Sequence, residues 1–110
     1  MTDVVARFYP AQVLLPDRTL LRKASVVLAQ NGPEAGVWAF IRPDETDPAF
    51  RGVVDWPATT VPSQRQARNG FDVRLVDGTV LTVTAGASCR CGSLGRWAGP
   101  SWARSVAVRA

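Results

Sequence analysis

The sequence predicts an all-β fold: a small antiparallel barrel, roll or sandwich of six to seven strands, followed by an irregular C-terminal arm rich in Gly, Arg and Trp. Short runs of β-branched and aromatic residues recur along the 110 residues, and eight prolines and nine glycines punctuate them. No stretch has the periodicity of a helix of three turns. A chain of this length forms one domain that buries about two-thirds of its unfolded surface, so neither a disulfide nor a metal is needed for folding.

Residues 71–84 predict the central β-hairpin, because Asp77 and Gly78 separate two alternating, β-branched runs. A two-residue turn would scatter the apolar residues over both faces. A three-residue loop with Gly78 in the left-handed region instead pairs Val73 with Leu81. Since a slip of one residue turns every side chain to the other face, the pattern with one apolar face is favoured. That face would hold Phe71, Val73, Leu75, Leu81 and Val83.

An earlier hairpin repeats this pattern. Residues 13–21 and 73–81 share the frame V-x-L-x-D-x-T-x-L. We predict a strand over 11–15, a turn at Pro16-Asp17-Arg18 and a new strand from Thr19. A duplicated unit would explain the repeat, but two hairpins of the same loop type on similar strands would look alike anyway, and we favour that interpretation. Arg18 takes the place of Gly78 and would hold a positive φ at a cost on the order of 1 kcal/mol.

The remaining N-terminal elements follow from turn residues and apolar runs. Residues 1–10 are expected to be an irregular lead-in pinned to the core by Phe8 and Tyr9. Further strands are predicted over 25–30, 37–41 and 50–56, with an extension over 59–61. Residues 63–70 are polar and basic and predict a loop or one helical turn. Trp38 and Trp56 are predicted to lie in the core.

The chain divides into an antiparallel β-domain over 1–85 and an arm over 86–110, in which 86–100 is expected to be irregular and 105–109 alternates like a closing edge strand. From Ser88 onward the chain has four arginines and no acid, while the other nine basic residues balance nine acids, so the net charge of +4 lies in the arm. A basic arm can bind phosphate or an acidic protein face, or it can be a solvated tail.

The arm also supplies the predicted partner-binding residues. Tryptophan beside arginine is typical of interface anchors, in which the ring fills a pocket and the guanidinium makes planar contacts. The alternative is that the two tryptophans cover the open end of the barrel. The candidates for partner binding are Arg90, Arg96, Trp97, Trp102, Arg104 and Arg109.

Composition argues against most enzyme classes and cofactors. The sequence has no histidine, which removes the commonest general base and a main zinc ligand. Cys89 and Cys91 supply half of a zinc site, which two subunits would have to share, and their spacing suits a disulfide poorly. We therefore expect two free cysteines. The acidic loop with Asp44, Glu45 and Asp47 lacks the pattern of a calcium loop, so no metal, cofactor or enzymatic activity is predicted.

No apolar run is long enough to span a membrane, and the first ten residues lack the core of a secretion signal. The expected compartment is the reducing cytoplasm, and no membrane partner is predicted.

Two segments carry a resemblance. The first segment is Tyr9-Pro10-Ala11-Gln12-Val13-Leu14-Leu15-Pro16-Asp17. The second is Cys89-Arg90-Cys91-Gly92-Ser93-Leu94, which follows a V-D-G-T-V hairpin. Both resemble stretches of a group of short proteins of actinobacterial phages and prophages. That group usually has Gly where this chain has Arg90, and a Pro before the Leu that is absent here. Because the group lies among genes for virion assembly, the resemblance implies a capsid-associated, minor capsid or head–tail connector component. It implies no catalytic residue.

The sequence thus leads to a first hypothesis: a non-enzymatic phage virion structural protein, found in the virion and in the host cytoplasm during assembly, that binds other virion proteins in a homo- or hetero-oligomer. A second is a small β-barrel that binds nucleic acid, with Arg65, Arg68, Arg74 and the arm arginines contacting phosphates. A third is a peptide-binding adaptor that adds a partner strand to its sheet edge.

Overall fold

The computed structural model describes residues 2–42, 45, 47–92 and 95–97, with the backbone alone for 64, 87–92 and 95–97. Seven strands and two short helical segments make up this part of the chain. The strands are β1 (Thr2–Leu14), β2 (Leu20–Gln30), β3 (Gly36–Phe40), β4 (Phe50–Gly52), β5 (Phe71–Arg74), β6 (Val80–Gly92) and β7 (Gly95–Trp97). The helical segments are the 3-10 turn η1 (Trp56–Ala58) and the helix α1 (Gln64–Arg68).

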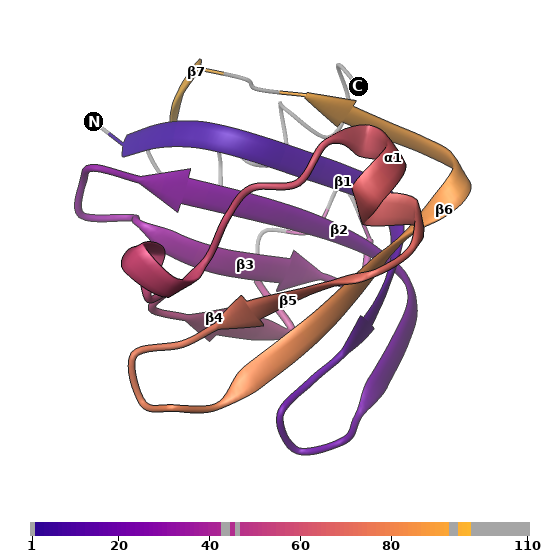
Figure 1. Cartoon of the computed structure of the whole chain (residues 1–110), viewed down its shortest axis with the longest axis horizontal. Coiled ribbons are helices and arrows are strands. Elements are labelled where there is room, and N and C mark those ends of the chain that lie inside the picture. Colours follow the sequence, from indigo (N-terminus) through magenta and orange to yellow (C-terminus); the bar gives the residue numbers. More distant parts are fainter. Residues whose placement is uncertain (1, 43–44, 46, 93–94, 98–110) are drawn as a thin grey trace.

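The strands form one antiparallel sheet in the order β4-β3-β2-β1-β6-β5, curled into a half-barrel (Figure 1). Its two edges meet at one point, where Val54 bridges Leu75. The N–H of Asp55 donates to the carbonyl of Arg74 at 2.8 Å, and the N–H of Val76 donates to that of Val53 at 3.0 Å. The all-β class predicted from the sequence is therefore confirmed.

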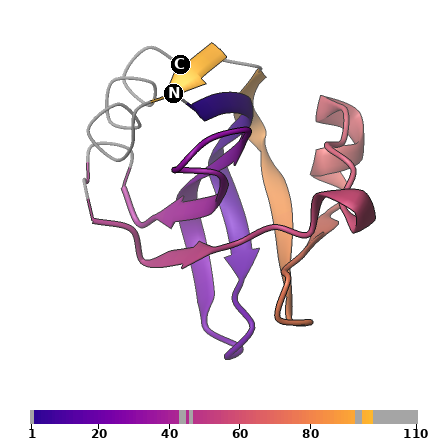
Figure 2. The same cartoon turned by 90° about the vertical axis from the view of Figure 1, so that its left-hand side faces the viewer.

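The main core lies on the concave side of the sheet. Its residues come from every part of the curl, among them Phe8, Val13, Leu28, Leu75 and Leu81. Figure 2 shows η1 and α1 on the same side of the sheet. Ala67 of α1 is fully buried in this core, and Trp56 of η1 packs against it while staying partly exposed.

A capping box starts α1. The hydroxyl of Ser63 accepts from the N–H of Gln66 at 3.3 Å, and the side chain of Gln66 accepts from the N–H of Ser63 at 2.9 Å. The short helix predicted as one of two alternatives for 63–70 is the one that forms.

A second apolar cluster is formed by one residue of β1 and by residues of β2 and β3 that face away from the main core. It consists of Val4, Val27, Ala29, Trp38 and Phe40. The Trp38 and Phe40 rings stack with centroids 6.4 Å apart, and the Arg51 guanidinium lies 4.1 Å from the centre of the Trp38 ring. Both faces of β2 and β3 are thus buried here, which explains their unbroken apolar runs.

The central hairpin has the predicted three-residue loop. Val73 pairs with Leu81 and Phe71 with Val83, and Gly78 has a φ of 89°. Of the predicted apolar face, Phe71 is partly buried and the other four residues are buried. The choice of the register with one apolar face is confirmed.

The first hairpin has the same loop geometry. The N–H of Leu15 donates to the carbonyl of Thr19 at 2.8 Å, and the equivalent bond from Leu75 to Thr79 is 2.9 Å. Arg18, at the position of Gly78, has a φ of 71°. The shared sequence frame therefore encodes one type of bulged loop, used twice.

Exchanging the two left-handed residues should show this equivalence. Arg18→Gly relieves a strain of about 1–2 kcal/mol but gives the unfolded chain about 0.4–1 kcal/mol of conformational freedom, so we expect a net gain of up to about 1.6 kcal/mol. Gly78→Arg should lose up to about the same amount, for the same reasons. Urea unfolding of both variants measures the two changes. A loss of stability in Arg18→Gly would show that the Arg18 side chain contributes more than its backbone costs.

Residues 2–10 are not an irregular lead-in but the first half of β1. Pro10 has no N–H to give to a ladder, so prolines inside strands are confined to bulges and edges. Here the register of β1 shifts between Phe8 and Ala11 against β2, and between Tyr9 and Ala11 against β6. The bulge accommodates Pro10 on both sides of the strand. Phe8 is buried as predicted, while Tyr9 is partly exposed.

Other predicted strands differ in length. The strands expected from Thr19 and over 25–30 are one strand, β2. The strand expected over 50–56 ends at Gly52, apart from the bridge at Val54, and η1 follows because Pro57 suits the start of a helical turn. The extension over 59–61 does not form.

The arm is not irregular throughout. Strand β6 runs to Gly92, across the division expected at 85–86, and β7 pairs with β1. Gly92 lies opposite Arg7 and Gly95 lies opposite Val4, so β6 and β7 pair with β1 in the same register. Strand β7 therefore continues along the same edge of β1 as β6. The strand predicted over 105–109 lies outside the described residues.

Candidate functional site

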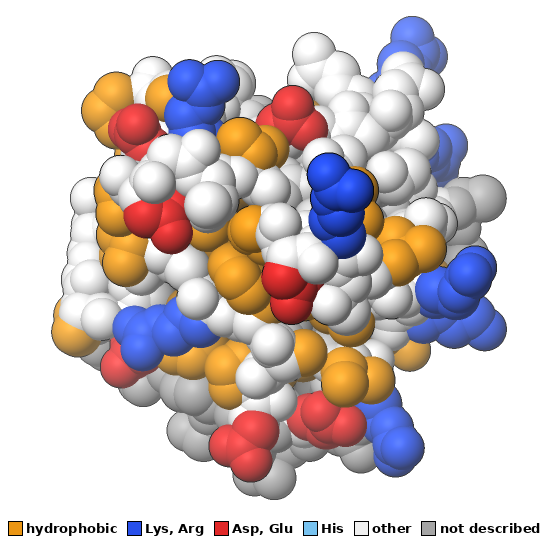
Figure 3. Space-filling model, turned by 90° about the horizontal axis from the view of Figure 1, so that it is seen from below, with side chains coloured by type: hydrophobic (Ala, Val, Ile, Leu, Met, Phe, Trp, Pro, Cys, Tyr) orange, Lys and Arg blue, Asp and Glu red, His pale blue; other side chains and the backbone are white. Residues whose placement is uncertain are grey.

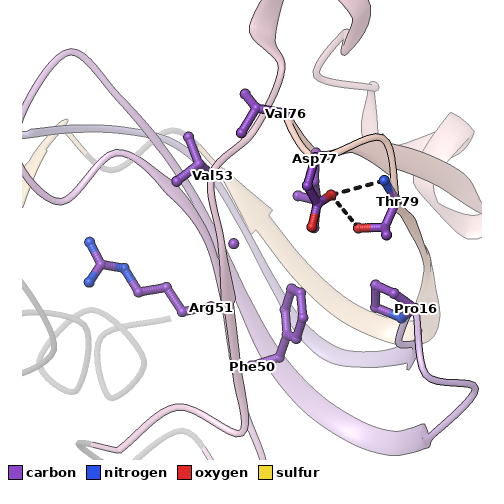
Figure 4. A pocket seen from close by; sticks show the side chains of 9 residues that line it. Pro16, Phe50, Arg51, Val53, Val76, Asp77 and Thr79 are labelled. Carbon is purple, nitrogen blue, oxygen red and sulfur yellow. Dashed lines mark hydrogen bonds between the residues drawn. The ribbon is translucent and has the colours of Figure 1, made fainter.

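An apolar groove of about 630 Å³ lies where the two sheet edges diverge. One wall is β4, the other is the loop between β5 and β6, and Pro16 of the first hairpin closes one end (Figure 4). Its volume falls in the range of about 300–1,000 Å³ typical of binding pockets. The lining residues are Pro16, Phe50, Arg51, Gly52, Val53, Leu75, Val76, Asp77 and Thr79.

The groove follows from how the half-barrel closes. The ladder that joins the edges ends at Val53 and Val76, and beyond it the sheet edge and the loop separate. Gly52 leaves room at this point, because a Cβ there would lie 2.9 Å from the Leu75 Cδ1 atom. In the part of the chain that the structure describes, β4 has β3 as its one strand partner, so its other edge faces the groove.

The rim of the groove is unusually apolar for a surface. Val53 is 59% exposed and Val76 is 64% exposed, and no other large apolar side chain among the described residues exceeds these values. Seen from the side of the two hairpin turns, the surface has exposed hydrophobic side chains between acidic and basic ones (Figure 3). Two exposed valines beside an apolar pocket are the feature of this surface that best suits a binding partner.

The two charged side chains of the lining differ in orientation. Arg51 extends away from Pro16 and Asp77 (Figure 4) toward Trp38, and its guanidinium lies 3.7 Å from the Glu34 carboxylate. The Asp77 carboxylate lies on the groove side and accepts hydrogen bonds from the Thr79 hydroxyl at 2.6 Å and the Thr79 N–H at 2.9 Å. The fixed charge available to an occupant of the groove is therefore negative.

Hydrogen bonding keeps this charge at low pH. The hydroxyl of Thr79, and then its N–H, lower the pKa of Asp77 below the ordinary value of 3.8. In the first hairpin the N–H of Thr19 lowers the pKa of Asp17 in the same way, donating to its carboxylate at 2.9 Å. Both groups remain ionised throughout the physiological range.

These two shifts predict an acid-dependent loss of stability. Both pKa values are depressed on folding, so the stabilisation is complete above the unfolded value of 3.8 and is lost as the pH falls through the lower folded values. Asp17→Asn with Asp77→Asn should flatten this part of the curve of unfolding free energy against pH. Urea unfolding between pH 2 and 6 measures it. If the double variant loses unfolding free energy just as steeply at low pH, other carboxyl groups cause the loss.

The structure brings some of the predicted partner-binding residues together and leaves others undetermined. Arg90 lies in β6 opposite Tyr9, and in β7 Arg96 lies opposite Asp3 and Trp97 opposite Thr2. These three residues lie along the same edge of β1, away from the groove. Trp102, Arg104 and Arg109 lie outside the described residues.

The candidates for metal binding gain no support. Cys89 and Cys91 lie on β6, with Cys91 opposite Phe8. Of the acidic loop, Asp44 is outside the described residues, and Glu45 lies 3.8 Å from Arg42 in an ion pair. No group of three or more potential ligands occurs within the described ranges.

The arginines considered for nucleic-acid binding are exposed but belong to different elements. Arg65 and Arg68 lie on α1, and Arg74 ends β5. The backbone N–H of Arg74 donates a hydrogen bond to the Thr59 hydroxyl at 3.2 Å. Arg74 therefore lies beside Thr59 rather than on α1, and α1 itself contains no aromatic residue.

Sequence reasoning missed the groove, because its walls are far apart along the chain. One local signal was present: Val76 is an apolar residue within a turn, where polar residues are usual. Val76 is exposed because the hydrogen bond between Leu75 and Thr79 closes the loop and leaves Val76 at its surface.

No family model, curated protein or solved structure matches this chain. No helix within the described residues has the length and hydrophobicity that crossing a membrane requires.

Proposed function

We propose that this chain is a non-enzymatic structural subunit of a phage virion that binds neighbouring subunits through its sheet edge. The observation that carries the proposal is the apolar groove, in which Val53 and Val76 are exposed beside the open edge of β4. A partner segment bound there would remove both valines from water and extend the sheet. The groove has few groups suited to chemistry, since Arg51 faces Glu34 and Asp77 is bonded to Thr79.

The virion part of the proposal comes from the phage resemblance. The two segments that carry it meet in the sheet where β1 pairs with β6 at Tyr9 and Arg90. Most of the first segment lies opposite earlier residues of β6, from Thr82 to Ala85.

The proposal is tested by the sedimentation of native particles. A lysate of the source is fractionated on a density gradient, and this chain is located by mass spectrometry. A virion subunit travels with particles of megadalton size, in a fixed ratio to the other particle proteins. A chain that stays near the top of the gradient as a free small protein contradicts the virion role.

A peptide-binding adaptor would use the same groove, and the same gradient separates the two roles. An adaptor binds extended segments transiently and does not travel with particles at a fixed copy number. The groove would then still be the binding site, and an affinity for extended apolar peptides that is lost in Val76→Asp would identify it.

A further inference from the structure

We infer that the groove binds the C-terminal segment 105–109 of a second copy of this chain as an added β-strand. The inference rests on the proposed role of the groove as a subunit contact, and it names the partner. It follows from the open sheet edge, the charge of the groove and the length of chain that follows β7.

The groove offers an incomplete sheet. Strand β4 pairs with β3 on one side, and its other edge approaches the β5 side only at the ladder that ends at Val53 and Val76. Beyond the ladder, the space between β4 and the loop is about 630 Å³. An extended segment laid along β4 would supply backbone partners for its open edge and side chains for the space.

The sequence of the C-terminal segment fits this space. Val106 and Val108 alternate with smaller or polar residues, so in a strand both valines point to one face. That face can cover the exposed valines of the groove, while Arg109 projects from the opposite face at the end of the segment. No other part of the C-terminal 23 residues has such an alternation beside a basic end.

Charge favours the same pairing. The chain from Ser88 onward carries all of the excess positive charge and no acid. The groove presents the Asp77 carboxylate, and Asp17 follows Pro16 at the closed end. Hydrogen bonds from Thr79 and Thr19 keep both carboxylates ionised, so a basic strand is attracted and an acidic one is repelled.

The distance to be covered favours a second copy over the same copy. Trp97 pairs with Thr2 at the start of β1. The groove residues Pro16 and Asp77 belong to the two hairpin turns, which lie at the opposite end of the molecule from β7 (Figure 1). Residues 98–104 span at most about 25 Å when fully extended. The molecule measures 29 × 27 × 24 Å, and a path over its surface is longer than a straight line. A neighbour can place 105–109 in the groove without this constraint.

Such a contact joins unlike surfaces, the groove of one copy and the C-terminal segment of the next. Contacts of this kind build rings or open filaments rather than closed pairs. This is the type of repetition that a subunit of a larger assembly requires.

The test is the self-association of the purified full-length chain, followed by analytical ultracentrifugation over a range of concentrations. We expect the average mass to rise above that of two copies. Val76→Asp removes the apolar contact with Val106 and Val108 and buries a carboxylate against them, a cost greater than its attraction for a basic segment. This variant and the double variant Val106→Asp/Val108→Asp should each weaken association at least tenfold. Ile41→Asp is the matched control: Ile41 is 53% exposed and does not line the groove. It should associate as the natural chain does.

Mixing the variants gives the sharper result. Val76→Asp retains its C-terminal segment and the double variant retains its groove, so an equimolar mixture should form a one-to-one dimer and stop there. The inference is overturned if Val76→Asp associates like the natural chain, or if the mixture stays monomeric. It is also overturned if the natural chain is monomeric at every concentration. In that case, an equal loss of unfolding free energy in Val76→Asp and in the double variant would show that the segment binds the groove of its own copy.

The two proposals fail separately. A chain that travels with virus particles but does not self-associate retains the proposed function with a different partner in the groove. A chain that self-associates through the groove but is absent from particles retains the inference and loses the virion role.

Discussion

Replacing Leu81 by Ala is expected to lower the free energy of unfolding by about 2–5 kcal/mol. Leu81 is fully buried in the main core, opposite Val73 in the central hairpin. Removing its side chain loses the hydrophobic contribution of the buried atoms and leaves a cavity that the curled sheet cannot close. Urea unfolding followed by tryptophan fluorescence measures the change.

Its neighbour provides the control. Val80 is 37% exposed on the opposite face of the same strand, opposite Arg74. Val80→Ala should change the free energy of unfolding by about 0.5 kcal/mol or less, as is usual for surface positions. Equal losses in the two variants would mean that the faces of the hairpin are not divided between core and solvent.

Gly36→Ala is expected to have a comparably large effect. Gly36 has a φ of 137°, and a Cβ there would lie 2.3 Å from the Gly52 carbonyl oxygen. The conformation costs a non-glycine residue about 1–3 kcal/mol, and relieving the clash with a backbone atom costs about 1–3 kcal/mol more. Because Gly52 belongs to β4, the substitution should also push β4 away from β3 and distort the groove.

Gly78→Ala separates these two contributions. Gly78 also has a positive φ, of 89°, but a Cβ there would meet nothing within 4 Å. The control should therefore lose about 1 kcal/mol, the conformational part alone. Thermal unfolding of both variants compares them. If they are equally destabilised, the close approach of Gly36 to β4 does not contribute.

Local chemistry explains why the hairpins could be predicted. The Asp-x-Thr pattern of each loop forms its own hydrogen bonds, from Thr19 to Asp17 and from Thr79 to Asp77. The alternation of the central hairpin then allows one register with an apolar face. Neither feature depends on distant parts of the chain, so a sequence of fourteen residues was enough.

The start of β1 and the end of β6 were missed for a common reason. Pro10 and Gly86 discourage strand structure when each is considered alone. In the sheet they lie at the same irregularity, where a Cβ on Gly86 would be 3.2 Å from the Pro10 carbonyl oxygen. The residues that seemed to end each strand instead allow the two strands to bend together.

The groove could not be predicted because it arises from tertiary closure. Pro16, Phe50 and Val76 come from three separate parts of the chain and meet only when the half-barrel curls. The sequence did indicate interaction at a sheet edge, but it directed attention to the tryptophans and arginines of the arm. In the proposed contact, the arm of one copy is one half and the groove of the next copy is the other.

The most direct test of the central claim is the incorporation of Val76→Asp into particles. Because Val76 is 64% exposed, the variant should keep the unfolding midpoint of the natural chain. Supplied in the source in place of the natural chain, it should stay near the top of the density gradient, while Ile41→Asp travels with the particles. Incorporation of Val76→Asp at the natural copy number would contradict the claim that subunits bind through the groove.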